Sequence, residues 1–509
     1  MKEKNKKKPE ASMKIWLVLI FLAVFSFRLA FSLRTSGFTG DESYYNLRQI
    51  ENIEKTGKPI GYDELSYSGR EFAVIPGMHY LLAGISLLFS RWISKEILFK
   101  IILNFFSATA AILAYAIVFE LSHSKSSSLV AAFATAFAPI FVGSTINSIS
   151  SFSISIPLNL LLIYFFMKSE YDLPSVIKFM GVLMLAALTD ALVMMVLIGI
   201  LLYILMINVE EMPESPARIE LIIFSVIFVF WVDFIVFKDA FLTHGLGMIW
   251  KNIPAEISSR YFTRTNLINI VYSINIMPFL AGIYVIYNYT GREKKKNIYL
   301  FAGIVTVLLV LLWLKLIELW VGLMIIGIFF AILMGYFHHS ISSYLAKTKI
   351  AGKTFAISAA FLLLLIASTA VNSWQSAYSA SANSFSKNEE EALKFLSGID
   401  CNAVVSAPDS GMMIEYFAKK KTVMDSQFLM IPKINERYSD VKSIYETSYE
   451  TNAIGTMDNY DADIIYLSER EKSEFGVDAL KFTQDKRCFE LLYNNSVLIY
   501  RKLCRLGSA

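Results

Sequence analysis

The chain is dominated by apolar runs that are long enough to cross a lipid bilayer. A transmembrane helix needs about 20 predominantly apolar residues. Runs of this kind lie near residues 14–34, 97–121, 129–147, 153–168, 174–189, 191–208, 218–237, 267–288, 298–314, 318–337 and 354–372. With 55% hydrophobic residues among 509, the chain has more apolar surface than a soluble core can bury. The sequence therefore predicts a multi-pass α-helical membrane protein with about eleven transmembrane helices, and nothing in it indicates nucleic-acid binding.

A lysine-rich start, "MKEKNKKK", precedes the first apolar run. Secretory signal peptides begin in the same way, but here the apolar run continues to Leu33 without a small-residue cleavage site. We therefore expect an uncleaved first helix. Because cytoplasmic loops are rich in lysine and arginine, we expect residues 1–13 to form a cytoplasmic N-terminal tail.

The segment 75–93 is short for a membrane span and carries His79 and Arg91. These features predict an interfacial amphipathic helix. If the segment crossed the membrane instead, the number of spans would be twelve and every later loop would change sides.

The distribution of positive charge favours eleven spans. With that number, the basic clusters 291–297 and 346–353 fall on the same side as the N-terminal lysines, as the positive-inside rule requires. The first outer loop, 35–96, and a later outer loop, 238–266, then face outward, together with residues 373–509.

Residues 373–509 have a different pattern from the transmembrane domain, 14–372, because their apolar residues come in short runs between polar stretches. "NAVVSA", "TVMDS" and "DADIIYLSE" indicate strands, whereas "NEEEALKFLSGI" and "SGMMIEYFA" indicate helices. "RCFELLYNNSVLIYRKL" is typical of a terminal hairpin. This order predicts a small extracytoplasmic α/β domain with parallel strand pairing.

All three cysteines, Cys401, Cys488 and Cys504, lie in this C-terminal segment. Disulfides persist in oxidising compartments, so an outward-facing domain allows one bridge and leaves one thiol over. A Cys401–Cys488 bridge is one candidate pairing, and the sequence leaves the choice open.

An adjacent acid pair, Asp41 and Glu42, follows the first span directly. Charged groups at a membrane boundary are often catalytic, metal-binding or ion-conducting, and the plain alternative is a pair of solvated loop charges. Here the pair follows Gly40 and precedes Tyr44 and Tyr45 at the start of a predicted helix. This context favours a functional interpretation.

The stretch "GDESYYNLRQIENIEKTGKPIGYDELSYSGRE", followed by "IPGMHYLLAG", resembles the GT-C superfamily of integral-membrane glycosyltransferases. It is similar to the protein O-mannosyltransferase and aminoarabinose transferase branch, which favours an Asp-Glu pair, and to the catalytic subunit of oligosaccharyltransferase. The arrangement of 129–162 and the stretch "SAPDSGMMIEYFAKKKTVMDS" (406–426) are closer to the second branch.

The resemblance implies a GT-C fold and a sugar donor carried on polyprenyl (dolichyl) phosphate. It implies that Asp41 is the general base, that Glu42 orients Asp41 or the acceptor or ligates a metal, and that Tyr44 and Tyr45 contact substrate. An inverting transfer needs such a base on one face of the sugar and stabilisation of the leaving phosphate on the other.

Two departures from the oligosaccharyltransferase pattern affect metal and acceptor binding. The region 144–155, where that family has a second acidic motif, has no carboxylate, and "APDSG" replaces the acceptor motif "WWDYG". A divalent cation (Mg or Mn) needs several hard oxygen ligands. The metal candidates are therefore weak ones, Asp41 and Asp190, and metal dependence stays open. Other acids near the outer boundary are Asp233, Asp239 and Glu318.

Cations on the outer side are needed to bind the carrier phosphate. The loop 238–266 supplies His244, Lys251, Arg260 and Arg264, and its glycines and proline are typical of a movable flap. Lys315 lies between the ninth and tenth predicted spans, and the alternative for all of these side chains is interfacial anchoring.

These features together predict a membrane glycosyltransferase that transfers a sugar from a polyprenyl-phosphate donor to a glycan, lipid or protein acceptor at the outer face, with inversion. One alternative is oligosaccharyltransferase-like transfer of a lipid-linked glycan to protein. The others are a non-catalytic GT-C relative and a transporter.

Overall fold

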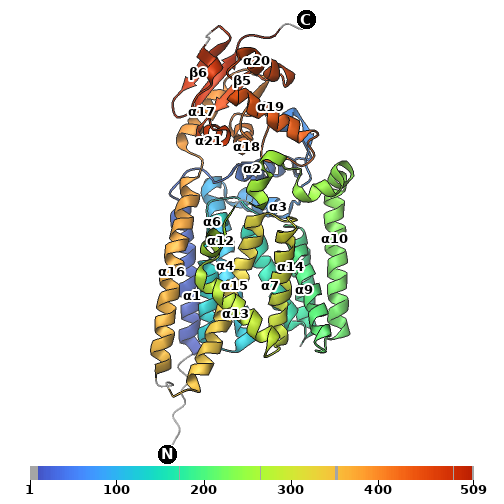
Figure 1. Cartoon of the computed structure of the whole chain (residues 1–509), viewed down its shortest axis with the longest axis vertical. Coiled ribbons are helices and arrows are strands. Elements are labelled where there is room, and N and C mark those ends of the chain that lie inside the picture. Colours follow the sequence, from blue (N-terminus) through green and yellow to red (C-terminus); the bar gives the residue numbers. More distant parts are fainter. Residues whose placement is uncertain (1–9, 171, 264, 350–352, 485–486, 507–509) are drawn as a thin grey trace, which may run out of the picture.

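The computed structural model describes residues 10–170, 172–263, 265–349, 353–484 and 487–506. This part of the chain has two layers along the long axis, a helical bundle and, at one end of it, a domain built from the C-terminal residues (Figure 1).

Within the described residues, seven helices are long and apolar enough to cross a membrane. They are α1 (Glu10–Ser32), α4 (Lys95–Ser122), α9 (Leu192–Val209), α10 (Pro216–His244), α14 (Lys296–Trp313), α15 (Leu319–Ala346) and α16 (Thr354–Ala382). Each coincides with one of the predicted apolar runs. Helix α16 continues beyond residue 372, where the sequence predicts the end of the transmembrane domain.

Two further predicted runs fold as bent helix pairs. Helices α5 (Lys125–Ala136) and α6 (Pro139–Thr145) meet at 44°, and α12 (Leu267–Ile274) and α13 (Ile276–Gly291) meet at 92°. Proline begins α6 because it fits the first turn of a helix but not its interior.

At the second bend, Asn275 adopts a left-handed φ of 81°, and its side chain accepts a hydrogen bond from the backbone N–H of Met277. Two shorter apolar helices, α7 (Phe152–Lys168) and α8 (Leu173–Ala187), match the remaining runs. The prediction of a multi-pass helical membrane protein is confirmed.

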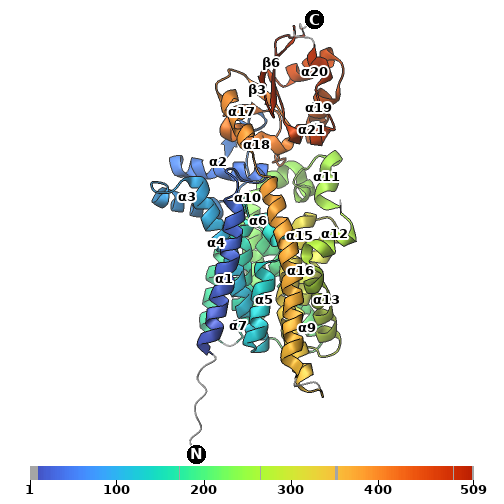
Figure 2. The same ribbon diagram turned by 90° about the vertical axis from the view of Figure 1, so that its left-hand side faces the viewer.

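The end of the bundle next to the C-terminal domain carries two short helices, α2 (Asp41–Thr56) and α3 (Gly77–Phe89). Both lie between the bundle and the C-terminal domain, and α2 runs across the bundle axis (Figure 2). Helix α3 has 13 residues, too few to span the hydrocarbon core. His79 Nε2 is 2.8 Å from Asn46 Oδ1, which ties α3 to α2. Between these helices lie β1 (Tyr62–Asp63), η1 (Ser66–Ser68) and β2 (Arg70–Glu71).

The C-terminal residues form an α/β domain around a five-stranded sheet of order β4-β3-β5-β7-β6. Strands β3 (Ala403–Val405), β4 (Lys421–Thr422) and β5 (Ile464–Leu467) are parallel, as predicted, whereas β7 (Leu498–Lys502) runs antiparallel to β5. Strand β6 (Phe489–Asn494) pairs with β7 as the predicted hairpin. The helices are α17 (Lys387–Ser397), α18 (Pro408–Phe417), α19 (Ile434–Glu446), α20 (Glu450–Asn459) and α21 (Glu469–Phe475), with η4 at Lys481–Gln484.

The disulfide joins Cys488 to Cys504, so the candidate Cys401–Cys488 pairing is wrong. The hairpin explains the difference, because it sets Phe489 opposite Lys502 and brings the residues that flank the two strands together. The backbone N–H of Leu503 donates to the carbonyl of Cys488 at 2.8 Å. Cys401 precedes strand β3 and keeps a free thiol.

Candidate active site

The acid pair lies in the first turn of α2, where a helix stabilises negative charge. Gly40, with a left-handed φ of 79°, allows the turn between the end of α1 and this helix. Successive residues of an α-helix point about 100° apart. Asp41 and Glu42 therefore enter two different environments.

Asp41 points into the contact between α2 and the C-terminal domain, where 4% of it is exposed. Its Oδ1 accepts a hydrogen bond from the backbone N–H of Met413 at 3.0 Å, and its Oδ2 accepts one from the Ser426 hydroxyl at 2.7 Å. Burial raises the pKa of Asp41 to about 8, and the Ser426 hydrogen bond opposes this rise while the nearby carboxylates Asp425 and Asp409 add to it.

Glu42 is exposed to solvent on the other side of the helix turn. It belongs to a group of four side chains, which we call the outer charge cluster, made up of Glu42, Asp190, Lys251 and Glu318. The Lys251 ammonium lies 2.6 Å from Glu318 Oε1. The surrounding protein raises the pKa of Glu42, and the Lys251 charge opposes this rise.

Asp190 joins the cluster from the connection between α8 and α9. Its Oδ1 accepts a hydrogen bond from the backbone N–H of Leu192 at 2.8 Å, and the Ser151 hydroxyl donates to Oδ2. Ser151 lies in the region 144–155, which has no acidic residue. This serine-rich region therefore reaches the site through a hydroxyl group.

The other boundary acids divide between the cluster and the surface. Asp233, on α10, interacts electrostatically with Asp190, whereas Asp239, on the same helix, is exposed to solvent. Asp409, at the start of α18, is also exposed and interacts with Arg470, Arg260 and Asp41.

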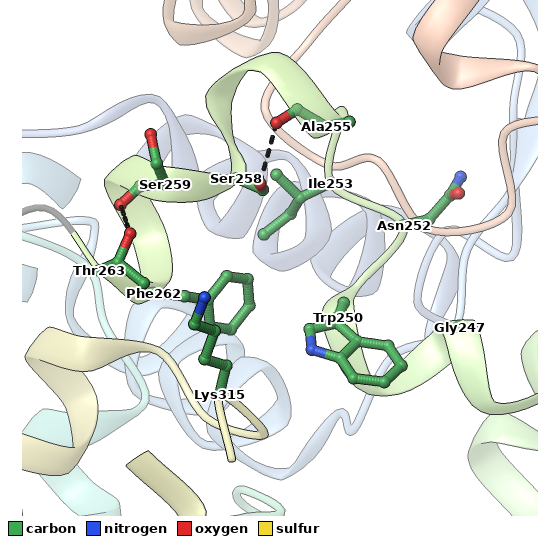
Figure 3. A pocket seen from close by; sticks show the side chains of 10 residues that line it. All are labelled: Gly247, Trp250, Asn252, Ile253, Ala255, Ser258, Ser259, Phe262, Thr263 and Lys315. Atoms are coloured by element: carbon green, nitrogen blue, oxygen red, sulfur yellow. Dashed lines mark hydrogen bonds between the residues drawn. The ribbon is translucent and has the colours of Figure 1, made fainter. Parts of the chain in front are cut away.

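A pocket of about 450 Å³ lies beside the outer charge cluster, between η2 (Gly245–Trp250), α11 (Ala255–Phe262) and the turn after α14. Figure 3 shows the Lys315 side chain extending into this space near Phe262, with Trp250 on the opposite wall. Lys315 is exposed, and its ammonium group has no hydrogen bond or ion pair among the described residues. We call this space the Lys315 pocket.

The other predicted phosphate ligands do not gather at this pocket. Arg260 forms an ion pair with Glu474 of α21, and Arg264 lies outside the described residues. His244 ends α10, half-buried, and its Nε2 has no hydrogen-bond partner among the described atoms.

Tyr44 and Tyr45 do not face the outer charge cluster. Tyr44 is 1% exposed, packs against Phe385, Tyr416 and Phe417, and accepts a hydrogen bond from the backbone N–H of Phe38 at 3.1 Å. Tyr45 is 8% exposed and packs against Phe72 and His79. Both rings join α2 to its neighbours, and their predicted contact with substrate stays a prediction.

The sequence interpretation did not assign a role to Ser426 or Arg470. Both lie in the C-terminal domain, near residues of the first outer loop and of α18, and no short motif marks either one. The sequence predicts Lys251 only as one of several cations in the loop 238–266. Its position directly after Trp250 is the local signal that it lies at the membrane boundary.

The carboxylates of this region do not form a ligand set for a divalent cation. In the described part of the chain, three ligand atoms from His, Cys, Asp or Glu come within 4.8 Å of one another only at Glu450, Cys488 and Cys504. The two cysteines there form the disulfide. The weak metal candidates Asp41 and Asp190 therefore belong to no such group within the described residues.

No protein-family model and no curated protein matches the sequence. Solved structures do match. The apo oligosaccharyltransferase of Archaeoglobus fulgidus aligns with a TM-score of 0.67 at 12% identity, covering 91% of this chain and 70% of that one. The same enzyme in complex with zinc and sulfate aligns with a TM-score of 0.60 at 14% identity, and the alignment covers 87% of this chain and 67% of that one. ArnT of Cupriavidus metallidurans, bound to undecaprenyl phosphate, aligns with a TM-score of 0.57 at 8% identity. This alignment covers 98% of this chain and 99% of that one.

Both neighbours are GT-C glycosyltransferases. The predicted GT-C fold is confirmed, and at these identities the likeness establishes the fold alone.

Proposed function

We propose that this protein transfers a sugar from a polyprenyl-phosphate carrier to an acceptor hydroxyl at the outer face of the membrane. The fold matches that of ArnT, which has been solved with undecaprenyl phosphate, over almost the whole of both chains. The observation that carries the proposal is the division of the acid pair. One carboxylate is buried with a raised pKa, and the other is open to solvent and interacts with the Lys251 ammonium, whose sequence neighbours line a pocket.

In this proposal Asp41 is the general base. An ordinary aspartate is a weak base, whereas a pKa of about 8 gives Asp41 more proton affinity near neutral pH. Its Oδ2 already accepts a hydrogen bond from a hydroxyl group, that of Ser426. An acceptor hydroxyl that replaces the Ser426 hydroxyl reaches the same oxygen.

The Lys315 pocket is the proposed site of the carrier phosphate. Lys315 is a cation without an ion-pair partner in the described chain, and Trp250 and Phe262 supply apolar walls next to it. Aromatic side chains suit the boundary between lipid and water. The A. fulgidus enzyme, which has the same fold, has been solved with sulfate, an anion of similar shape to phosphate.

The proposed orientation follows from the positive-inside rule, with the N-terminus in the cytoplasm and residues 373–509 as an extracytoplasmic domain. Cysteines introduced in place of Tyr449 and of Lys294 test it in intact cells with a membrane-impermeant maleimide. We expect labelling of Tyr449→Cys and none of Lys294→Cys, with the parent chain as the control for Cys401. The reverse labelling would overturn the orientation.

A transfer assay tests the function. The full chain in lipid vesicles is incubated with radiolabelled undecaprenyl-phosphate and dolichyl-phosphate monosaccharides and with hydroxyl-bearing acceptors. We expect transfer by the natural sequence, a loss of about 10²–10⁴-fold in Asp41→Asn, and a smaller loss in Glu42→Gln. Full activity of Asp41→Asn would remove Asp41 from the mechanism.

A second candidate is transfer of a lipid-linked oligosaccharide to protein, favoured by the higher TM-score of the oligosaccharyltransferase match. A parallel assay with diphosphate-linked oligosaccharides and sequon peptides separates the two. Transfer in this assay alone would replace the first proposal. Transfer in neither assay would favour the non-catalytic or transporter interpretation.

A further inference from the structure

The outer charge cluster contains an ammonium group among three carboxylates that come from three separate segments. Glu42 begins α2, Asp190 precedes α9, and Glu318 precedes α15. Lys251 lies 2.6 Å from Glu318 Oε1 and interacts electrostatically with Glu42 and Asp190. A single lysine thus joins segments that are distant in sequence.

The backbone around Lys251 is fixed in place. Lys251 and Asn252 both have left-handed φ values, of 50° and 54°, and the backbone N–H of Lys251 donates to the Met248 carbonyl at 2.8 Å. The Asn252 side-chain amide donates to the carbonyls of Phe428 at 2.9 Å and Ile431 at 2.8 Å in the C-terminal domain. The loop that carries Lys251 is therefore anchored to that domain through the Asn252 side chain.

Lys251 lies in the chain between two residues of the Lys315 pocket. Its sequence neighbours Trp250 and Asn252 line the pocket, and its ion-pair partner Glu318 lies three residues after Lys315. Both lysines therefore lie close to the proposed phosphate site.

A divalent cation does not fit this arrangement. Mg²⁺ and Mn²⁺ need several oxygen ligands converging at about 2.0–2.2 Å, and no three carboxylates of the cluster converge within the described residues. Asp190 is already hydrogen-bonded to Ser151 and Leu192, and Asp41 to Met413 and Ser426. The ammonium of Lys251 is paired with Glu318 and interacts electrostatically with the third carboxylate of the cluster, Glu42.

We propose that Lys251 supplies the positive charge that a divalent cation would supply in this fold, so that the transferase works without a metal ion. This inference rests on the proposed function. As the acceptor oxygen bonds to the anomeric carbon, the bond from that carbon to the phosphate oxygen breaks and its electron pair goes to the phosphate. The acceptor proton goes to Asp41. The Lys251 ammonium then stabilises the charge that develops on the phosphate oxygen.

The first test is a transfer assay on the full chain in lipid vesicles, with EDTA and with added Mg²⁺ or Mn²⁺. We expect EDTA and added metal to change the transfer rate of the natural sequence by less than about twofold. The transfer rate of Lys251→Met is expected to be lower by about 100-fold or more at every metal concentration. Lys251→Arg keeps the charge and is expected to retain part of the activity. Lys238→Met, which replaces an exposed lysine near the end of α10, is the control and is expected to keep the transfer rate of the natural sequence. Activity that EDTA abolishes and Mn²⁺ restores would overturn the inference.

The second test is independent of activity. Binding of Mn²⁺ to the vesicle-reconstituted protein is measured by electron paramagnetic resonance for the natural sequence, Lys251→Met and Glu318→Gln. We expect no site-specific Mn²⁺ binding in the natural sequence. Binding that Glu318→Gln abolishes would overturn the role of Lys251 even if no transfer substrate is found. Absence of transfer together with absence of Mn²⁺ binding would overturn the proposed function and with it the role of Lys251 in transfer, and would leave only the conclusion that the cluster binds no divalent cation.

Discussion

The two sides of helix α2 differ in the burial and pairing of the charged side chains near them. On the side that faces the C-terminal domain, Arg48 is buried and paired with Asp63 and Glu415. On the other side, Glu42, Lys251 and Lys315 are exposed to solvent, and Lys315 lines a pocket. The Arg48 contacts fix the position of the domain, whereas the exposed charges are available to a substrate.

The largest expected effect comes from breaking the buried side. Arg48 is 8% exposed and makes two contacts with Asp63, at 2.6 and 2.7 Å, while Glu415 is fully buried. Arg48→Met leaves two buried carboxylates without their cation. Loss of one partner from a buried pair costs about 3–5 kcal/mol, so we expect a large drop in the midpoint of thermal unfolding in detergent.

The exposed ion pair between Lys442 and Glu256, at 2.8 Å, is the matched control for this measurement. Lys442→Met is expected to leave the unfolding midpoint unchanged, because surface pairs contribute little. Equal effects of the two variants would contradict the difference between the two sides of α2.

The next effect concerns the pH dependence of Asp41. The base must be ionised to act, so the transfer rate of the natural sequence is expected to rise with pH through about 8. Stability changes in the opposite direction. The folded-state pKa lies above the ordinary value near 4, so the stability contributed by protonated Asp41 is complete below about pH 4 and is lost as the pH rises through about 8.

Asp41→Asn separates these two effects, because the amide stays neutral at every pH. We expect this variant to melt at a higher temperature than the natural sequence at pH 9 and at a similar temperature at pH 4. Differential scanning calorimetry at both pH values checks this. A lower melting temperature at pH 9 would show that ionised Asp41 stabilises the domain contact.

Hydrophobic length and charge predicted the bundle, because span length is a local property of the sequence. They also predicted the acid pair as the start of the site. They did not predict that the two acids would point into different environments, because Asp41 accepts hydrogen bonds from Met413 and Ser426, which are 372 and 385 residues away. The packing of Tyr44 was not predictable for the same reason, because Tyr416 and Phe417 follow more than 300 residues later.

A moderate effect is expected in the Lys315 pocket. Lys315→Met removes a cation that has no partner in the described chain, so no buried group is left unpaired and the unfolding midpoint should not change. If the pocket binds the carrier phosphate, the apparent KM for the donor should rise by about tenfold, which corresponds to about 1.4 kcal/mol. A fall in kcat at constant KM would place Lys315 outside ground-state donor binding.

The smallest expected effect tests the boundary between the two sides. The Ser426 hydroxyl donates to Asp41 Oδ2 at 2.7 Å and lowers the pKa of that carboxyl. Ser426→Ala removes this hydrogen bond from the ionised form, so the pKa of Asp41 should rise further. A hydrogen bond to a charged group contributes about 1.5 kcal/mol, which is about one pKa unit. We therefore expect the pH–rate profile to move about one unit toward alkaline pH with little change in the maximal rate.

Ser410→Ala, which changes a buried serine of α18, is the matched control and should leave the pH–rate profile in place. An unmoved profile in Ser426→Ala would show that the titrating base is a group other than Asp41, and Glu42 would be the next to examine because it shares the same helix turn.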